Sequence, residues 1–147
     1  MLTIAIGSDH GGFEYKQKLV HHLAGLGYLV NDLGTYLEES VHYPVFGEAV
    51  ARSVASGASD FGIVICTSGE GIMMSANKVD GIRCGLGYND EVSKLMRQHN
   101  NANVIAFGQK FMKYEDVERR VDIFLNTEFE GGRHQKRIDM IMDIENE

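Results

Sequence analysis

The sequence is poor in cysteine and proline, and each shortage limits what the protein can be. Only two cysteines occur among 147 residues, both in segments with the character of a β-strand. A disulfide framework would need more of them, so we expect reduced thiols and a cytoplasmic location. The single proline is isolated, and no linker, low-complexity run or long repeat divides the chain. The sequence therefore predicts one domain over residues 1–147.

Positive charge and long apolar runs are also scarce. Lys and Arg number 14 against 21 Asp and Glu, which gives a formal net charge of −7. Nucleic acid is not expected as a partner, because phosphate backbones are bound by basic surfaces. All apolar runs are much shorter than the roughly 20 residues of a membrane-spanning helix, and the first residues lack the apolar stretch of a signal peptide. We therefore expect no membrane association.

Segments with the pattern of strands alternate with segments that have the period of helices. Strands are expected at 1–8, 28–33, 61–66, 81–88 and 104–107. Helices are expected at 13–23, 45–55, 72–77, 91–98 and 117–125, with a last helix at about 133–145. This alternation predicts an α/β fold, a three-layer Rossmann-like sandwich whose five-stranded parallel sheet carries helices on both faces. The last helix has an apolar side that could cover the sheet or pack on a partner subunit.

Cys66 ends the third predicted strand, at the edge where ligands bind in an open parallel sheet. The next residues, Thr67-Ser-Gly-Glu-Gly71, are mostly small, so their backbone N–H groups can approach a substrate closely. The start of the following helix favours an anion, including a thiolate. Cys66 is therefore a candidate base.

Asp9 and His10 follow the first predicted strand and so reach the same edge as Cys66. Three polar or ionisable groups would then converge on one crevice. The competing interpretation is that Asp9 only caps the next helix, because Asp is a preferred N-cap residue.

Arg133 and Arg137 are four residues apart and would point the same way from the first turns of the last helix. Positive charge there opposes the helix dipole by about 0.3–1 kcal/mol for each residue unless an anion joins it. A phosphate site is therefore plausible, although a solvated basic face is the alternative. Lys110, after the fifth strand, would add a positive charge at the carboxyl edge of the sheet.

Other candidates are weaker. A carboxylate at Glu70 would be stabilised by the helix dipole, so a structural role is at least as well supported as acid or base chemistry. His21, His22 and His134 have no metal-ligand spacing with each other or with the acidic residues, and HExxH and clustered CxxC motifs are absent, so no metal is expected. Gly69-Glu-Gly71 is not followed by a third glycine, since that position is Met74, and no nucleotide cofactor is expected. A phospho-acceptor signalling module would need a carboxylate in place of Cys66.

Six motifs together resemble the ribose-5-phosphate isomerase B and galactose-6-phosphate isomerase family of sugar-phosphate isomerases. They are Ile4-Ala-Ile-Gly-Ser-Asp-His-Gly-Gly-Phe13, Asp32-Leu-Gly-Thr-Tyr36, Ala76-Asn-Lys-Val79, Arg97-Gln-His-Asn100, Ala102-Asn-Val104 and Phe129-Glu-Gly-Gly-Arg-His134. The resemblance extends through nearly the whole chain.

The resemblance implies cofactor-free interconversion of an aldose phosphate and a ketose phosphate through an enediol, in a homodimer or a dimer of dimers. It implies that Cys66 is the base, that Asp9 and His99 assist ring opening, and that the amides of Thr67 to Gly71 hold the enediolate oxygen. The phosphate ligands that it implies are His10, Arg133 and Arg137, and the sugar contacts are Tyr43 and Asn100. The expected substrates are ribose 5-phosphate and ribulose 5-phosphate.

Some positions depart from the common family pattern. Ser68 takes the position of a hydroxyl-bearing residue, Glu70 replaces a commonly apolar one, and Lys110 stands where arginine is common. His42 replaces an Asp usual in ribose-phosphate isomerases, and His42-Tyr-Pro44 is similar to the galactose-6-phosphate branch. The alternatives are the same chemistry on galactose 6-phosphate, allose 6-phosphate or a tetrose phosphate, or a non-catalytic sugar-phosphate-binding module.

His99 is expected at the opposite edge of the sheet from Cys66. It ends a helix just before Val104 opens the fifth strand, whereas Cys66 closes the third. Five residues of strand separate the two edges by roughly 16 Å, which is too far for both groups to act on one small sugar. We therefore expect an active site shared between subunits, with His99 supplied by the partner.

Overall fold

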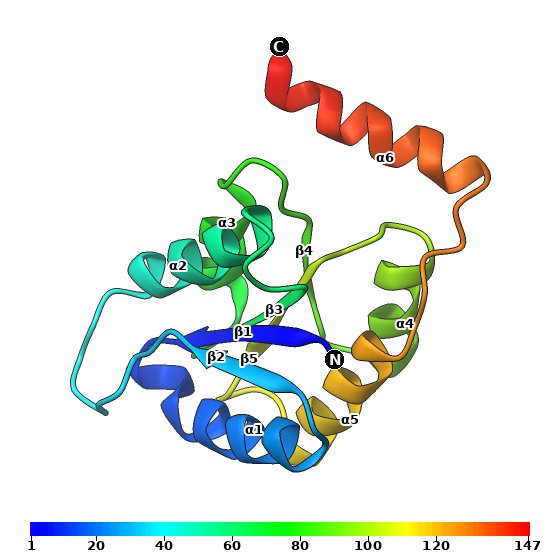
Figure 1. The fold of residues 1–147 in the computed structure, drawn as a ribbon. Coiled ribbons are helices and arrows are strands. Elements are labelled where there is room, and N and C mark those ends of the chain that lie inside the picture. Colours follow the sequence, from blue (N-terminus) through cyan, green and yellow to red (C-terminus); the bar gives the residue numbers. More distant parts are fainter.

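Five parallel strands form the centre of the molecule, in the order β2-β1-β3-β5-β4 (Figure 1). The structure is a computed structural model that describes residues 1–147. The strands are β1 (Thr3–Ser8), β2 (Leu29–Asp32), β3 (Phe61–Cys66), β4 (Cys84–Leu86) and β5 (Val104–Gly108). The helices are α1 (Phe13–Gly25), α2 (Tyr43–Ala55), α3 (Glu70–Asn77), α4 (Asp90–Gln98), α5 (Tyr114–Leu125) and α6 (Arg133–Asp143), with short 3₁₀ turns η1 (His10–Gly12) and η2 (Ile144–Asn146). The predicted fold class is confirmed.

Alternate residues of the central strands pack into two separate cores. Ile4 and Ile6 belong to one core, with side chains from α1, α4 and α5, whereas Ala5 belongs to the other, with side chains from α2 and α3. Figure 1 shows the same arrangement, with α2 and α3 on one face of the sheet and α1, α4 and α5 on the other. Because both faces are covered, the central strands are apolar throughout, as parallel strands usually are.

Some element boundaries differ from those expected. β4 covers only Cys84–Leu86, because this edge strand pairs with β5 alone and lies among several glycines, which favour strands poorly. α2 begins at Tyr43, with Pro44 in its first turn, where a missing backbone N–H is tolerated. α5 begins at Tyr114, before the apolar period from which it was predicted.

The last helix, α6, does not lie on either face of the sheet. Figure 1 shows it projecting from the body, at the end of a connecting segment that runs past α4. Its end is attached by Glu145 of η2, which accepts a 2.9 Å hydrogen bond from the Gly81 amide. Ile138 is buried, but the side chains of Met140 and Ile144 are about 60% exposed. The suggestion that α6 covers the sheet is therefore wrong, and packing on a partner subunit stays a prediction.

Candidate active site

The candidate groups on β1 and β3 meet at the point where the strand order reverses. β1 lies between β2 and β3, so the chain connects from β1 to β2 on one side, and β3 then lies on the other side of β1. Ligand crevices in open α/β sheets form at such points, beyond the carboxyl ends of the strands. Asp9 directly follows β1, and Cys66 is the last residue of β3. The predicted convergence of these two groups is present in the structure.

Cys66 is held against the loop that follows it. Its side chain is 5% exposed, and its sulfur accepts a 3.2 Å hydrogen bond from the amide of Gly69. Gly69 reaches this position with a φ of 86°, in the left-handed region that favours glycine. The sulfur therefore lies against an amide donor at the start of α3. Burial raises the pKa of the other thiol, Cys84, well above its usual range, so Cys84 stays protonated and cannot serve as a base.

The loop after Cys66 presents free amide groups. The Gly69 amide is used by the sulfur, and the Glu70 amide donates to Ser68 Oγ at 3.2 Å. The amides of Thr67, Ser68 and Gly71 donate to no group in the chain. These three donors, rather than all five amides of the loop, are available to an oxyanion.

Asp9 is a buried carboxylate that lacks a full set of partners. It is 5% exposed, and its Oδ1 makes no hydrogen bond. Burial raises the pKa of this carboxyl group, and the nearby His10 and the backbone of Gly11 and Gly12 oppose that effect. The side chain makes no capping bond to the turn that follows it. Asp9 is therefore not a regular N-cap, and its unbonded oxygen is suited to accept a proton from a ligand or a hydrogen bond from a ligand hydroxyl.

His10, Tyr43 and Lys110 surround the same edge. The Nδ1 atom of His10 accepts a 3.1 Å hydrogen bond from the Val41 amide, so its proton belongs on Nε2. The ring of Tyr43 covers Gly71 so closely that an added Cβ would lie 2.6 Å from it. The Lys110 amide donates to the Thr67 carbonyl at 3.1 Å. A hollow of about 640 Å³ between α1 and the start of α5 is lined in part by Gly11, Thr67 and Lys110, although neither Cys66 nor Asp9 lines it.

The remaining candidates lie at the opposite edge. His99 follows the end of α4, Asn100 comes next, and β5 starts only at Val104. α6 begins beside them, because the Glu130 amide donates to the Gln98 carbonyl at 3.1 Å and the ring of His134 stacks on His99. Arg133 and Arg137, both exposed, are therefore on the His99 side of the sheet.

One chain thus holds two groups of candidate residues that do not meet. The first group, at the carboxyl edge, is Asp9, His10, Tyr43, Cys66, Thr67, Ser68, Gly69, Glu70, Gly71 and Lys110. The second group, at the amino edge, is His99, Asn100, Arg133 and Arg137. The expectation that both arginines join His10 on one phosphate is not met within a single chain. The position of the two arginines could have been predicted from the sequence, since α5 returns the chain to the amino edge, where α6 must then begin.

Two buried or half-buried arginines that fix the position of His99 were not anticipated. Arg97 donates to the Ala102 carbonyl at 2.7 Å and to the Thr127 carbonyl at 3.1 Å. Arg83 donates to the Asn101 carbonyl at 2.8 Å. Both guanidinium groups hold the turn that carries His99, and a buried carbonyl without such a donor would be destabilising.

A buried ion pair fixes the loop on the other side of the site. Lys16 is fully buried, and its Nζ lies 2.8 and 2.9 Å from the two carboxylate oxygens of Asp32. Asp32 also accepts a 3.0 Å hydrogen bond from the Gly34 amide. The signal was present in the sequence, because Lys16 interrupts the apolar side of α1.

One cluster has the composition of a metal site. The ligand atoms of His99, Glu130 and His134 lie within 4.8 Å of one another. The two rings, however, are stacked with an angle of 14° between their planes, so their in-plane lone pairs run side by side instead of converging. In this geometry the two rings are better placed to share the Glu130 carboxylate than to bind a metal ion. The absence of a metal stays a prediction.

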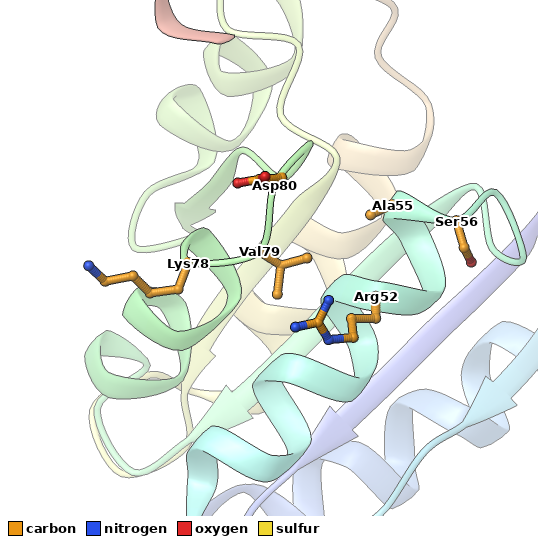
Figure 2. A pocket seen from close by; sticks show the side chains of 6 residues that line it. All are labelled: Arg52, Ala55, Ser56, Lys78, Val79 and Asp80. Carbon is orange, nitrogen blue, oxygen red and sulfur yellow. The ribbon is translucent and has the colours of Figure 1, made fainter. Parts of the chain in front are cut away.

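A further hollow lies away from both groups. It has a volume of about 510 Å³ between the end of α2 and the turn after α3 (Figure 2). Figure 2 shows Lys78 extending away from Arg52, and Arg52 is paired with Glu48 at 2.8 Å. None of the candidate residues from either group lines this hollow, so it is not treated as the active site.

None of the helices has both the length and the apolar composition needed to cross a membrane.

Comparison with known proteins agrees with this geometry. Residues 4–141 match the family model described as Ribose/Galactose Isomerase. The chain is 43% identical to ribose-5-phosphate isomerase B of Escherichia coli, over 99% of this chain and 97% of that protein. It is 38% identical to the galactose-6-phosphate isomerase subunit LacB of Clostridium acetobutylicum, over 99% of this chain and 86% of that protein.

Solved structures give the same result. Ribose-5-phosphate isomerase B of Clostridium thermocellum superposes with a TM-score of 0.97 at 45% identity, covering 99% of this chain and 98% of that one. The Mycoplasma genitalium enzyme, solved with bound ribulose 5-phosphate, superposes with a TM-score of 0.95 at 40% identity, covering 99% and 97%. The resemblance found in the sequence motifs is therefore confirmed, and the chain belongs to the ribose/galactose isomerase family.

Proposed function

We propose that this protein is a cofactor-free aldose–ketose isomerase that interconverts ribose 5-phosphate and ribulose 5-phosphate. The observation that carries the proposal is the pairing of a buried thiol and a buried, incompletely bonded carboxylate at neighbouring strand ends. Proton transfer between adjacent carbons needs a base, a group for the hydroxyl proton and donors for the developing oxyanion, and this edge supplies all three. Membership of the family supports the same reaction.

The reaction would proceed in two stages. Asp9 takes the proton of the C1 hydroxyl while His99 gives a proton to the ring oxygen, and the bond between C1 and that oxygen breaks to leave an aldehyde. The Cys66 thiolate then removes the proton from C2. The free amides of Thr67, Ser68 and Gly71 hold the enediolate oxygen, and each such donor typically lowers the barrier by a few kcal/mol. The proton of the C2 hydroxyl passes to the oxygen on C1, and the thiol returns its proton to C1, so that C2 becomes a carbonyl and the product is the ketose.

We also propose that the working enzyme is a homodimer or a dimer of dimers with shared active sites. His99, Asn100, Arg133 and Arg137 from one copy would complete the site that holds Cys66 and Asp9 of the other. This arrangement would explain why α6 projects from the body with apolar side chains exposed (Figure 1). It would also bring the arginines to the phosphate that His10 binds. A cytoplasmic location remains a prediction from the two free cysteines.

A substrate panel with matched cysteine variants tests the reaction. Ribose 5-phosphate, allose 6-phosphate, galactose 6-phosphate and a tetrose phosphate would be assayed for aldose–ketose conversion. General-base catalysis typically contributes about 10²–10⁴-fold, so Cys66→Ala should lose at least a hundredfold in kcat. Cys84→Ala, which removes the other buried thiol, is the control and should keep the parent's kcat. Activity of Cys66→Ala within a few-fold of the parent would contradict the proposal and make Glu70 the next candidate for the base.

A hexose 6-phosphate is the second candidate substrate. His42 precedes α2, next to the Tyr43 ring that covers the loop, in the position where an Asp is usual in ribose-phosphate isomerases. A larger kcat/KM for galactose 6-phosphate or allose 6-phosphate than for ribose 5-phosphate in the same panel would favour it. Failure to convert any sugar phosphate, with phosphate binding retained, would favour a binding module instead.

A further inference from the structure

The ring of His99 has a second imidazole packed against it. The His134 ring stacks on it with a distance of 4.3 Å between centroids and an angle of 14° between planes. Glu130 lies at the edge of this stack, with its Oε1 atom 3.4 Å from Nε2 of His99 and 3.7 Å from Nε2 of His134. His134 is 8% exposed, although most of the first turn of α6 is exposed. Part of this burial comes from the stacked ring of His99, which is itself half-buried.

The arginines hold the backbone around His99 but leave its ring free. Arg97 and Arg83 donate to carbonyl groups of the turn, and neither contacts the imidazole. Apart from Glu130, the ring has no polar partner in the chain. The orientation of the imidazole about its own side-chain bonds therefore depends on the His134 stack and on the Glu130 carboxylate.

The electrostatic setting suits His134 to a neutral supporting role. Burial lowers the pKa of His134, and His99, Arg133 and Arg137 lower it further, while Glu130 opposes them. Two imidazolium rings at this distance would repel each other, so a neutral His134 allows its neighbour to carry a proton. Aromatic rings in contact prefer particular relative orientations, so the stacked His134 ring favours one orientation of the His99 ring.

We propose that His134 and Glu130 are positioning residues that orient the His99 imidazole for proton donation to the sugar ring oxygen. The inference rests on the proposed function, in which His99 assists ring opening. Glu130 faces Nε2 of His99, so Nδ1 is the nitrogen left to give its proton as the bond between C1 and the ring oxygen breaks. Neither His134 nor Glu130 touches the reacting atoms in this scheme.

The test compares three variants of the assembled enzyme with the parent. His134→Ala removes the stacked ring, whereas His134→Phe keeps a flat ring of similar size. Gln135→Ala is the matched control, because Gln135 is exposed on the same turn of α6 and bonds only to Asp139. Misplacing a catalytic group by about 1 Å can lower the rate by up to about 100-fold, so we expect His134→Ala to lower kcat roughly tenfold with little change in KM. His134→Phe should recover most of that loss, and Gln135→Ala should match the parent.

An NMR measurement reports the ring geometry without using activity. Stacking shifts the ring protons of His99 upfield, and this shift should disappear in His134→Ala and persist in His134→Phe. Glu130→Gln, which keeps the size of the side chain, should broaden or move the same signals and lower kcat. Circular dichroism would establish that each variant is folded. If His134→Ala does not fold, the comparison of His134→Phe with the parent still tests the proposal.

The outcomes separate this inference from the function on which it rests. Parental activity of His99→Ala would overturn the ring-opening role of His99 and this inference with it. An inactive His99→Ala together with a fully active His134→Ala would overturn this inference alone. Equal losses in His134→Ala and His134→Phe, with the upfield shift kept in the latter, would show that stacking does not position His99.

Discussion

Complementation between two inactive variants tests the shared active site directly. β3 pairs with β5 so that Cys66 is opposite Gly108 and Gly62 is opposite Val104. Cys66 is thus four residues beyond the start of β5, about 13 Å along the strand. His99 lies a further five residues before that start, in the turn after α4. No movement of a side chain within one chain closes this gap, so Cys66→Ala and His99→Ala should each inactivate a different half of the site.

The recovered activity can be calculated from the symmetry. In a mixed dimer, one site has lost both groups and the other has kept both. Random exchange of equal amounts gives mixed dimers for about half of the population, so about a quarter of all sites should be intact. Activity should therefore rise from near zero to about a quarter of the parent's value as the subunits exchange.

The assay is isomerisation of ribose 5-phosphate after the two variants have been mixed under mild dissociating conditions. Differently tagged copies allow mixed dimers to be purified, and their activity should be about half that of the parent. Each variant mixed with a differently tagged copy of itself is the control and should stay inactive. Purified mixed dimers as inactive as either variant would refute the shared site, and His99 would then act within its own chain or be structural.

Three further predictions follow from single contacts. Arg137→Ala should raise KM and weaken inhibition by inorganic phosphate at least tenfold, since charge-assisted hydrogen bonds contribute roughly 1.5–3 kcal/mol. Lys136→Ala, at the exposed neighbouring position, is the control and should change neither quantity. An unchanged phosphate inhibition constant in Arg137→Ala would exclude Arg137 as a phosphate ligand. Asp9→Asn should stabilise the fold at pH 7 but not below pH 3.8. Burial raises the pKa of this carboxyl group in the folded state, so the cost of ionising it grows as pH rises. Thermal unfolding of both proteins across this pH range measures the effect, and a difference in Tm that does not change with pH would contradict it. Asp32→Ala should lower the free energy of unfolding by about 3 kcal/mol, because it leaves the fully buried Lys16 unpaired; urea denaturation measures the loss, and Lys16→Met in the same chain should restore most of it.

The strand pattern and the position of Cys66 could be predicted because both depend on local sequence. A buried parallel strand is a short apolar run, and the residue that ends it must face the carboxyl edge. The same reasoning placed Asp9 beside Cys66 and His99 at the far edge. These positions follow from chain direction alone, and the structure has them as expected.

Contacts between distant parts of the chain could not be predicted in this way. Lys16 visibly interrupts the apolar side of α1, but the choice of Asp32 as its partner depends on how the elements pack, and so does the hold of Arg97 on the turn after α4. The stack of His134 on His99 joins α6 to α4 across 35 positions of sequence, and only the folded chain reveals it. The placement of α6 away from the sheet likewise depends on contacts between distant parts of the chain, such as this stack.

The loop after Cys66 alternates between residues that are sterically fixed and residues that are free to vary. A Cβ at Gly69 would lie 2.8 Å from the backbone of Phe107, and one at Gly71 would lie 2.6 Å from the Tyr43 ring. Ser68 and Glu70, which alternate with these glycines along the chain, line a hollow of about 550 Å³. Divergence of this enzyme toward a longer or shorter sugar, in nature or by directed evolution, is therefore expected to act through Ser68 and Glu70, while both glycines stay unchanged.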